Sequence, residues 1–230
     1  MTIRSGLRRQ LAHVVRHRAP WLYSRNNLAR DARIVGKVWK ESPYFDEAEA
    51  DIDVQWQELI WPFISGSDFT CVVDLAAGHG RNSTKLRDVS GMIYIVDINA
   101  ENISYCRKRF AGDSIFRFVK TNGTKLKGIR SGEVSFIYCF DSMVHFDSDV
   151  IRAYLKEFHR VLRPGGRGFC HHSNYTARPG GDYLQSPGIR NFMSRELFAH
   201  YCAKEQLTVL KSTIVDWSEP QLDCFTLFTK

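Results

Sequence analysis

The sequence contains no uninterrupted apolar run that approaches the roughly 20 residues of a membrane-spanning helix. Its first residues also lack the apolar core, roughly 7–15 residues long, of a secretory signal peptide. These absences exclude a membrane-spanning protein and lead us to expect a cytoplasmic chain. No internal repeat or low-complexity segment is visible, and the 43% of hydrophobic residues suffice to bury a core. We therefore expect one domain with an extension.

Cysteine pairs at metal-ligand or redox spacing are also lacking. The six cysteines stand far apart with no C-x-x-C pair, mostly in apolar runs: Cys71, Cys106, Cys139, Cys170, Cys202 and Cys224. We expect buried free thiols in place of disulfides or zinc ligands. No cluster of carboxylates follows the fifth predicted strand either, so no metal site is expected.

The net charge of +7 comes from one end of the chain. Residues 1–40 carry ten Lys or Arg and a single acid, Asp31, whereas the remainder is slightly acidic. Basic and apolar residues alternate in residues 4–18 as in an amphipathic helix that lies on an anionic membrane surface. Peripheral membrane contact is a hypothesis, and a solvated helix packed on the domain is the alternative. Deleting residues 1–20 and measuring sedimentation with anionic liposomes distinguishes them.

Short apolar runs alternate with longer amphipathic segments from Thr70 onward, which is typical of strands and helices around a parallel sheet. The predicted strands are residues 70–76, 92–98, 114–120, 134–140, 166–172, 207–217 and 224–230. Only a short turn separates the last two, so they must be antiparallel, whereas the first five are joined by helical crossovers. We predict a helical N-terminal extension at residues 1–66 and a second unit at residues 67–230.

A loop of small residues, AAGHG, directly follows the first predicted strand. Such a loop lets backbone approach a ligand, and the following helix directs free N–H groups and a positive dipole end toward negative charge. Asp97 ends the second strand nineteen positions after Gly78, close to the roughly 20-residue spacing of a ribose-binding acid in nucleotide folds. The G-x-G-x-x-G spacing is absent, which disfavours a nicotinamide enzyme.

From Thr70 to its end, the chain resembles the class I S-adenosylmethionine-dependent methyltransferases. DLAAGHG matches the first motif of that family, an acidic residue followed by G-x-G-x-G, with Ala76 at the first glycine position. Alanine in place of this glycine should crowd the loop only slightly, provided that the position has a negative φ. LRPGG is similar to the family's lead into the fifth strand. The resemblance implies a doubly wound, Rossmann-like seven-stranded α/β sheet with an antiparallel C-terminal hairpin.

The resemblance also implies S-adenosylmethionine as cofactor and a set of residues that bind it. These are Asp74, Ala76, Gly78 and Gly80 around the first loop, Asp97 and Ile98 after the second strand, Asn122 and Gly123 after the third, and Phe140 after the fourth. Asp97 would take both ribose hydroxyls. Asn122 would hold the adenine amino group through its carbonyl oxygen, where the family more often has Asp.

The residues after the fourth strand indicate the kind of methyl acceptor. FDSM at 140–143 lacks the Asn/Asp-Pro-Pro-Tyr motif of enzymes that methylate base amino groups, and Cys170 lacks the setting of a pyrimidine nucleophile. Oxygen and small-molecule nitrogen acceptors remain. A hydroxyl acceptor requires a base, and His145, His171 and His172 follow strands whose carboxyl ends carry ligand sites. Since side chains alternate along a strand, one of the adjacent pair must point away.

The loop after the fifth predicted strand is long and polar, and such loops are usually functional or mobile. We predict acceptor-binding roles for Asp141, Asn174, Tyr175 and Arg190, because aromatic, amide and guanidinium groups suit a polyhydroxylated ligand. The C-terminal pattern is also similar to that of methyltransferases among bacterial surface-polysaccharide enzymes. We therefore predict O-methylation of a sugar hydroxyl in a surface glycan, such as O-antigen or exopolysaccharide, or its precursor.

Two further interpretations stay open. An RNA methyltransferase would use the basic arm for phosphate contacts. Nucleic acid is disfavoured, because residues 41–230 are net acidic and carry no recognised base-methylation motif. A non-catalytic module that keeps the fold as a scaffold is the other alternative, for which Ala76 and Asn122 are the signs of decay.

Overall fold

A computed structural model of the chain describes residues 25–40, 42–180 and 183–230. The basic segment at residues 1–20, for which we expected membrane contact, lies outside these residues. Among the helices of the described ranges, none has both the length and the apolar character needed to cross a lipid bilayer.

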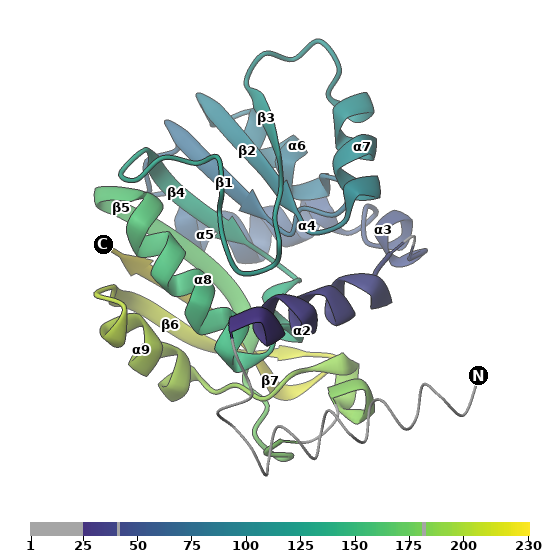
Figure 1. The fold of residues 1–230 in the computed structure, drawn as a ribbon, viewed down its shortest axis with the longest axis vertical. Helices are drawn as coiled ribbons and strands as arrows, with labels where there is room; N and C mark the ends of the chain where they lie inside the picture. Colours follow the sequence, from purple (N-terminus) through teal and green to yellow (C-terminus); the bar gives the residue numbers. More distant parts are fainter. Residues whose placement is uncertain (1–24, 41, 181–182) are drawn as a thin grey trace.

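One seven-stranded sheet, ordered β3-β2-β1-β4-β5-β7-β6, organises the molecule (Figure 1). The strands are β1 Cys71–Leu75, β2 Met92–Asp97, β3 Phe116–Lys120, β4 Val134–Cys139, β5 Leu162–Ser173, β6 Thr208–Trp217 and β7 Glu219–Thr229. The first five pair in parallel, and β7 runs antiparallel to both β5 and β6. The predicted doubly wound sheet with an antiparallel C-terminal hairpin is confirmed.

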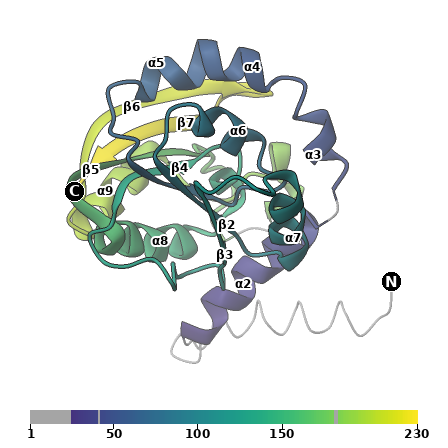
Figure 2. The same cartoon turned by 90° about the horizontal axis from the view of Figure 1, so that it is seen from above.

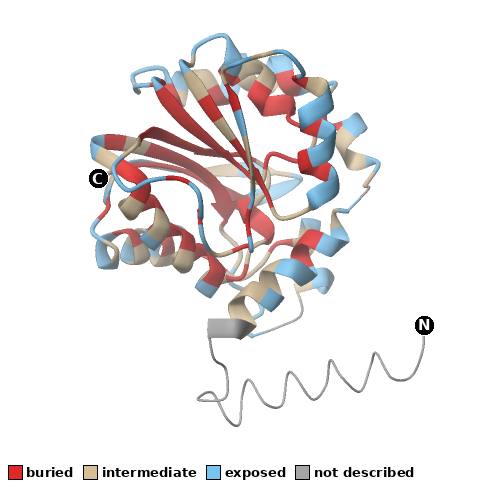
Figure 3. Cartoon of the chain, turned by 45° about the horizontal axis from the view of Figure 1, so that its top comes forward, coloured by how far each residue is buried: buried red, intermediate tan, exposed pale blue. Residues whose placement is uncertain are grey.

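Helices cover both faces of the sheet (Figure 2). One face carries α8 (Ser148–Val161) and α9 (Arg195–Lys204), whereas the other carries α5 (Trp61–Ile64), α6 (Arg81–Arg87) and α7 (Ala100–Arg109). The remaining elements are α2 Arg25–Val38, α3 Tyr44–Glu47, α4 Ile52–Gln55, the π-helical turn η2 Trp56–Ile60, and the 3₁₀ turns η3 Met143–His145, η4 Tyr183–Gln185 and η5 Pro187–Ile189. Figure 3 shows the central strands buried and the outer helix surfaces exposed.

Helix α8 follows its sequence signals closely. The Asp147 side chain caps its start by accepting a hydrogen bond from the Asp149 N–H at 2.9 Å. Its apolar residues recur at helical spacing and are buried against the sheet. The helix ends at Val161, three residues before Pro164, where the pyrrolidine ring has no N–H to donate.

Two local predictions are wrong. The connection between β3 and β4, residues 121–133, contains no helix; Gly123, Gly128 and Gly132 take φ of 90°, 90° and 69° there, which favours turns. The fifth strand starts at Leu162, four residues earlier than predicted. Leu162 already pairs with Val134 of β4, and the register then shifts at the RPGG turn so that Arg167 pairs with Phe136.

The N-terminal segment shares the core of the sheet. Ile60 and Ile64 are fully buried beside Val72 of β1 and Phe136 of β4. All six cysteines are buried free thiols, as predicted.

Candidate functional site

The loop after β1 turns sharply because alternate residues are left-handed. Ala76, Gly78 and Gly80 have φ of 56°, 58° and 81°. A Cβ at Gly78 would lie 2.6 Å from the Phe45 ring, and one at Gly80 would lie 2.7 Å from the Phe110 ring. Both positions therefore need glycine, for its backbone conformation and for space.

Asp97, at the end of β2, is held against this loop. Its Oδ2 accepts a hydrogen bond from the Gly78 N–H at 3.0 Å. Its Oδ1 accepts from the Asn99 N–H at 2.7 Å and from the Asn102 side-chain amide at 3.2 Å. Burial raises the pKa of this carboxyl to about 6, although the hydrogen bonds lower it. Since a carboxylate oxygen has two lone pairs, Oδ2 keeps one for a ligand.

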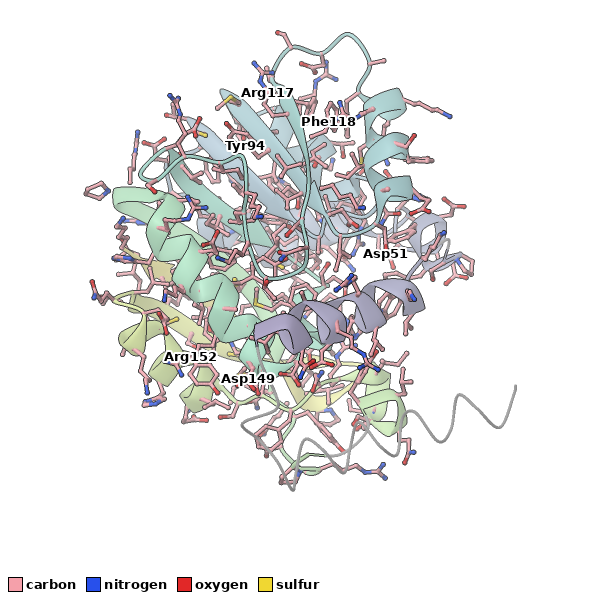
Figure 4. All side chains as sticks on the ribbon, viewed as in Figure 1. Asp51, Tyr94, Arg117, Phe118, Asp149 and Arg152 are labelled. Atoms are coloured by element: carbon pink, nitrogen blue, oxygen red, sulfur yellow. The ribbon has the colours of Figure 1, made fainter. Side chains whose placement is uncertain are left out.

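A pocket lies over Asp97 at the carboxyl ends of the strands, and the N-terminal segment forms one of its walls. This wall consists of Ala32, Val35 and Gly36 of α2, followed by Trp39, Tyr44 and Phe45. Helix α2 crosses this end of the sheet, whereas Tyr94, Arg117 and Phe118 mark the sheet's opposite part in Figure 4. The sequence predicted a helical cap but did not identify these pocket residues.

Helix α2 fits closely over the ends of β2 and β3. A Cβ at Gly36 would lie 2.6 Å from the Ile98 side chain, and one at Gly123 would lie 2.4 Å from the Ala32 Cβ. The Asn99 side-chain amide donates a hydrogen bond to the Gly36 carbonyl at 2.9 Å. The wall therefore packs closely on the sheet through small residues, with one partly buried hydrogen bond beside them.

Asp141 joins the N-terminal wall to the loop after β4. Its Oδ2 accepts hydrogen bonds from the Tyr44 hydroxyl and from Arg81 Nη2, the latter at 2.6 Å. Arg81 also donates to the Ala48 carbonyl at 2.8 Å. Burial, and then the charge of Asp141, raise the pKa of Tyr44, so its phenol stays a donor. Asp141 lines the pocket, and no described residue bonds its Oδ1.

His145, in the turn after β4, also lines the pocket and is 5% exposed. Its Nδ1 lies 2.8 Å from the carbonyl oxygen of Ile189. A carbonyl oxygen can only accept, so Nδ1 carries the hydrogen and Nε2 presents its lone pair. Burial lowers the pKa of His145 to about 4, which keeps the ring neutral at pH 7. In this tautomer Nε2 can accept a proton, as a general base must.

Trp39 packs against His145, with 4.5 Å between the ring centroids, and against Tyr44 at 5.6 Å. Its indole Nε1–H is buried and has no hydrogen-bond partner among the described residues. Leaving a buried donor unpaired costs roughly 1–3 kcal/mol, so this wall of the pocket is suited to a ligand acceptor atom.

Comparison with known proteins identifies the central part of the chain. A family model described as a methyltransferase domain matches residues 72–166. Residues 72–166 are therefore similar in sequence to a methyltransferase domain. The curated methyltransferase NsrG of Aspergillus novofumigatus is 27% identical over 133 residues, which are 56% of this chain and 51% of that protein. The chain thus spans about half the length of this curated relative.

Solved structures with this fold include two methyltransferases. A geranyl diphosphate methyltransferase in complex with S-adenosylmethionine has a TM-score of 0.60 at 15% identity, covering 79% of this chain and 84% of that one. An S-adenosylmethionine-dependent methyltransferase from Clostridium acetobutylicum has a TM-score of 0.58 at 15% identity, covering 79% and 98%. The family model and these structures together indicate S-adenosylmethionine as the cofactor.

The pocket fits that cofactor by its own chemistry. Gly78 lines the pocket, and because it has no side chain its backbone is open to a ligand there. Oδ2 of Asp97 keeps a lone pair for a ribose hydroxyl. Among the described residues, no three His, Cys, Asp or Glu side chains gather as metal ligands.

The structure brings five of the nine predicted cofactor residues to the pocket. These are Ala76, Gly78, Asp97, Ile98 and Gly123. The other four do not line it: Asp74, Gly80, Asn122 and Phe140.

Each of these four has another role. Asp74 lies beneath the loop and accepts a hydrogen bond from the Ser83 hydroxyl at 2.5 Å, and burial raises its pKa to about 7. Gly80 precedes the first residue of α6. Asn122 is exposed, and its Oδ1 accepts from the Thr124 N–H at 3.2 Å. Phe140 packs into the core, with its ring centroid 5.1 Å from that of His171. Position in the motif did not reveal which side of the loop each residue faces.

The structure overturns the prediction that His171 or His172 acts as the base. Both are fully buried and outside the pocket. His172 Nδ1 lies 2.9 Å from the Ser173 carbonyl, and its Nε2 lies 2.9 Å from the Thr226 hydroxyl. His171 Nδ1 accepts from the Asp141 N–H at 3.2 Å, and its Nε2 donates to Asp223. Neither ring keeps a free nitrogen for an acceptor.

The predicted acceptor residues after β5 are also corrected, because Asn174, Tyr175 and Arg190 lie outside the pocket. The side-chain amide of Asn174 donates to the Gln221 carbonyl at 3.0 Å. Tyr175 forms an isolated bridge with Phe192. Arg190 is buried against Asp223. Of the four predicted acceptor residues, only Asp141 lines the pocket.

Replacing Ala76 by glycine is expected to stabilise the protein. The left-handed conformation costs alanine about 1–2 kcal/mol, whereas glycine adopts it freely and loses about 0.5–1 kcal/mol of chain entropy on folding. We expect the free energy of unfolding to rise by roughly 0.5–1 kcal/mol in urea titration. Ala203→Gly, on the exposed surface of α9, should lower it by a similar amount. A loss of stability in Ala76→Gly would contradict this account of the loop.

Proposed function

We propose that the chain is an S-adenosylmethionine-dependent O-methyltransferase in which His145 is the general base. The observation that carries this proposal is the bond from Nδ1–H to the Ile189 carbonyl, which leaves Nε2 of a pocket residue unprotonated. Hydroxyl acceptors need such a base, because the oxygen must lose its proton as it gains the methyl group.

The bound cofactor supplies an electrophilic methyl group on a sulfonium sulfur. Asp97 would hold the ribose, and the Gly78 backbone, which lines the pocket, would lie beside the rest of the cofactor. His145 Nε2 would accept the proton of the acceptor hydroxyl as its oxygen takes the methyl group from the sulfonium. The Trp39 ring packs on His145 and restricts its rotation.

The proposed acceptor is a saccharide hydroxyl, such as that of a surface glycan or its precursor. The rings of Trp39 and Tyr44 offer apolar faces to a sugar ring. Asp141 Oδ1 and the unpartnered Trp39 Nε1–H supply one acceptor and one donor for hydroxyl groups. This combination of faces and polar atoms supports a polyhydroxylated ligand.

A methyl-transfer screen tests this function. The full chain would be incubated with methyl-labelled S-adenosylmethionine and four acceptor classes: surface glycan fragments, nucleotide-activated sugars, phenols and RNA transcripts. We expect label on a saccharide oxygen. Label only on RNA or phenols would reject the saccharide acceptor. Binding of S-adenosylhomocysteine with no transfer to any class would favour the non-catalytic module.

Removing the Trp39 donor should then weaken acceptor binding. Trp39→Phe keeps an aromatic ring but loses Nε1–H, a hydrogen bond worth about 0.5–1.5 kcal/mol. We expect the KM for the saccharide to rise roughly 3- to 10-fold, with unchanged affinity for S-adenosylhomocysteine. Trp61→Phe, outside this pocket, is the matched control. An unchanged acceptor KM in Trp39→Phe would remove Trp39 from the acceptor site.

A further inference from the structure

A strained turn presents the carbonyl that orients His145. Gly188 and Ile189 have φ of 53° and 58°, and a β-branched residue such as isoleucine rarely adopts this conformation. The Ile189 carbonyl oxygen lies 2.8 Å from His145 Nδ1. Such a backbone persists only where the surrounding structure holds it, so the contacts of this turn decide how His145 is oriented.

Arg190 holds the turn with its own side chain. Its Nη1 donates to the Gly188 carbonyl at 2.6 Å. Its Nε and Nη2 form a two-pronged pair with Asp223 on β7, at 3.0 Å to Oδ1 and 2.6 Å to Oδ2. The side chains of Arg190 and Asp223 are 6% and 0% exposed. The guanidinium plane thus fixes the turn to the C-terminal hairpin in one orientation.

Asp223 also reaches the other side of the pocket. Its Oδ2 accepts a hydrogen bond from His171 Nε2 at 2.9 Å. The opposite nitrogen of that ring, Nδ1, accepts from the backbone N–H of Asp141 at 3.2 Å. Asp141 has φ of 57°, so its backbone too is held in a strained conformation. One buried carboxylate, that of Asp223, is therefore connected both to the turn that bonds His145 and to the backbone of Asp141.

We propose that Asp223 and Arg190 are positioning residues that set the tautomer of His145 and the placement of Asp141. This inference rests on the proposed function, in which His145 is the base. Burying an ion pair rarely stabilises a fold more than apolar side chains of equal volume do, and its better attested use is to fix one geometry. Here the Asp223–Arg190 pair holds the turn at residues 188–189. The Ile189 carbonyl of that turn accepts the hydrogen bond from His145.

Imidazole ¹⁵N NMR of the full chain with S-adenosylhomocysteine tests the inference. The wild-type spectrum should show His145 protonated at Nδ1 alone and His171 at Nε2 alone. The glutamine in Arg190→Gln cannot replace all the hydrogen bonds that Arg190 donates to Asp223 and to the Gly188 carbonyl. Since the turn would then be held less firmly, we expect His145 to populate both tautomers. We also expect kcat for the saccharide to fall at least about 10-fold with little change in cofactor affinity, because Asp97 is outside this network.

Two further variants keep the test interpretable. Arg178→Gln makes the same change at an exposed arginine of the same loop and should change neither the spectrum nor kcat. Asp223→Asn removes the shared carboxylate and should alter both His145 and His171; it gives the readout if Arg190→Gln does not fold. A purely Nδ1-protonated His145 and wild-type kcat in a folded Arg190→Gln or Asp223→Asn protein would overturn the positioning role. Failure of methyl transfer in the wild type would instead reject the proposed function, since the NMR readout needs no acceptor.

Discussion

Replacing His145 by asparagine is expected to lower kcat for the saccharide acceptor by roughly 100- to 10,000-fold, the usual contribution of a positioned general base. The asparagine amide reaches the position of Nδ1 and can still donate to the Ile189 carbonyl. The base nitrogen, Nε2, is lost. Steady-state methyl transfer at saturating cofactor measures the effect.

The pH dependence of the wild type gives an independent check. Burial lowers the pKa of His145 to about 4, so the ring is already unprotonated at pH 5. With saturating cofactor, kcat should not fall near pH 6.5, where an ordinary histidine gains its proton, but only at lower pH. His200→Asn, an exposed histidine on α9, is the matched control. A His145→Asn enzyme with more than a tenth of wild-type kcat would exclude this residue as the base.

Replacing Asp97 by asparagine is expected to weaken S-adenosylhomocysteine binding by roughly 10- to 100-fold at pH 7.5. Hydrogen bonds to a charged group contribute about 1.5–3 kcal/mol, and the amide offers one acceptor oxygen where the carboxylate has two. The amide nitrogen would also face either the Gly78 N–H or the Asn99 N–H. Because both groups are then donors, that hydrogen bond would be lost. Isothermal titration calorimetry measures the change.

The same variant should lose a pH dependence that the wild type has. Burial raises the pKa of Asp97 to about 6, and the ribose hydroxyls need the charged form as acceptor. Wild-type affinity should therefore fall as pH drops below about 6, whereas Asp97→Asn should show no such step. Asp53→Asn, whose side chain is 71% exposed on α4, is the control. Wild-type affinity and pH dependence in Asp97→Asn would remove Asp97 from the cofactor site.

Patterns along a strand or helix were enough to predict the sheet. A short turn between the last two strands dictates their antiparallel pairing, and the capping Asp147 and the stop at Pro164 delimit α8. The glycine loop and Asp97 were also predictable, because their spacing follows from one strand–loop–helix unit. Ala76 shows the limit of that method, since only the structure reveals its positive φ.

Contacts between distant segments could not be predicted from local patterns. His171 and His172 lie at the carboxyl end of β5, yet β7 pairs beside them and supplies Asp223 and Thr226 as partners. The pairing of Trp39 with His145 likewise joins residues more than a hundred positions apart. The buried Nε1–H of Trp39 leaves no signal in the sequence, because any tryptophan can be fully hydrogen-bonded.

The small residues between α2 and the sheet have a consequence for engineering the donor site. Ala32, Gly36 and Gly123 set the height of the slot above Ile98, where a single added methyl group would already collide. We therefore expect that Ile98→Ala or Ile98→Val would make room for methyl-donor analogues with a bulky group on the adenine. His145, in the proposed acceptor site, would be unchanged. We therefore expect that the wall above the proposed nucleoside site and the proposed base can be altered separately.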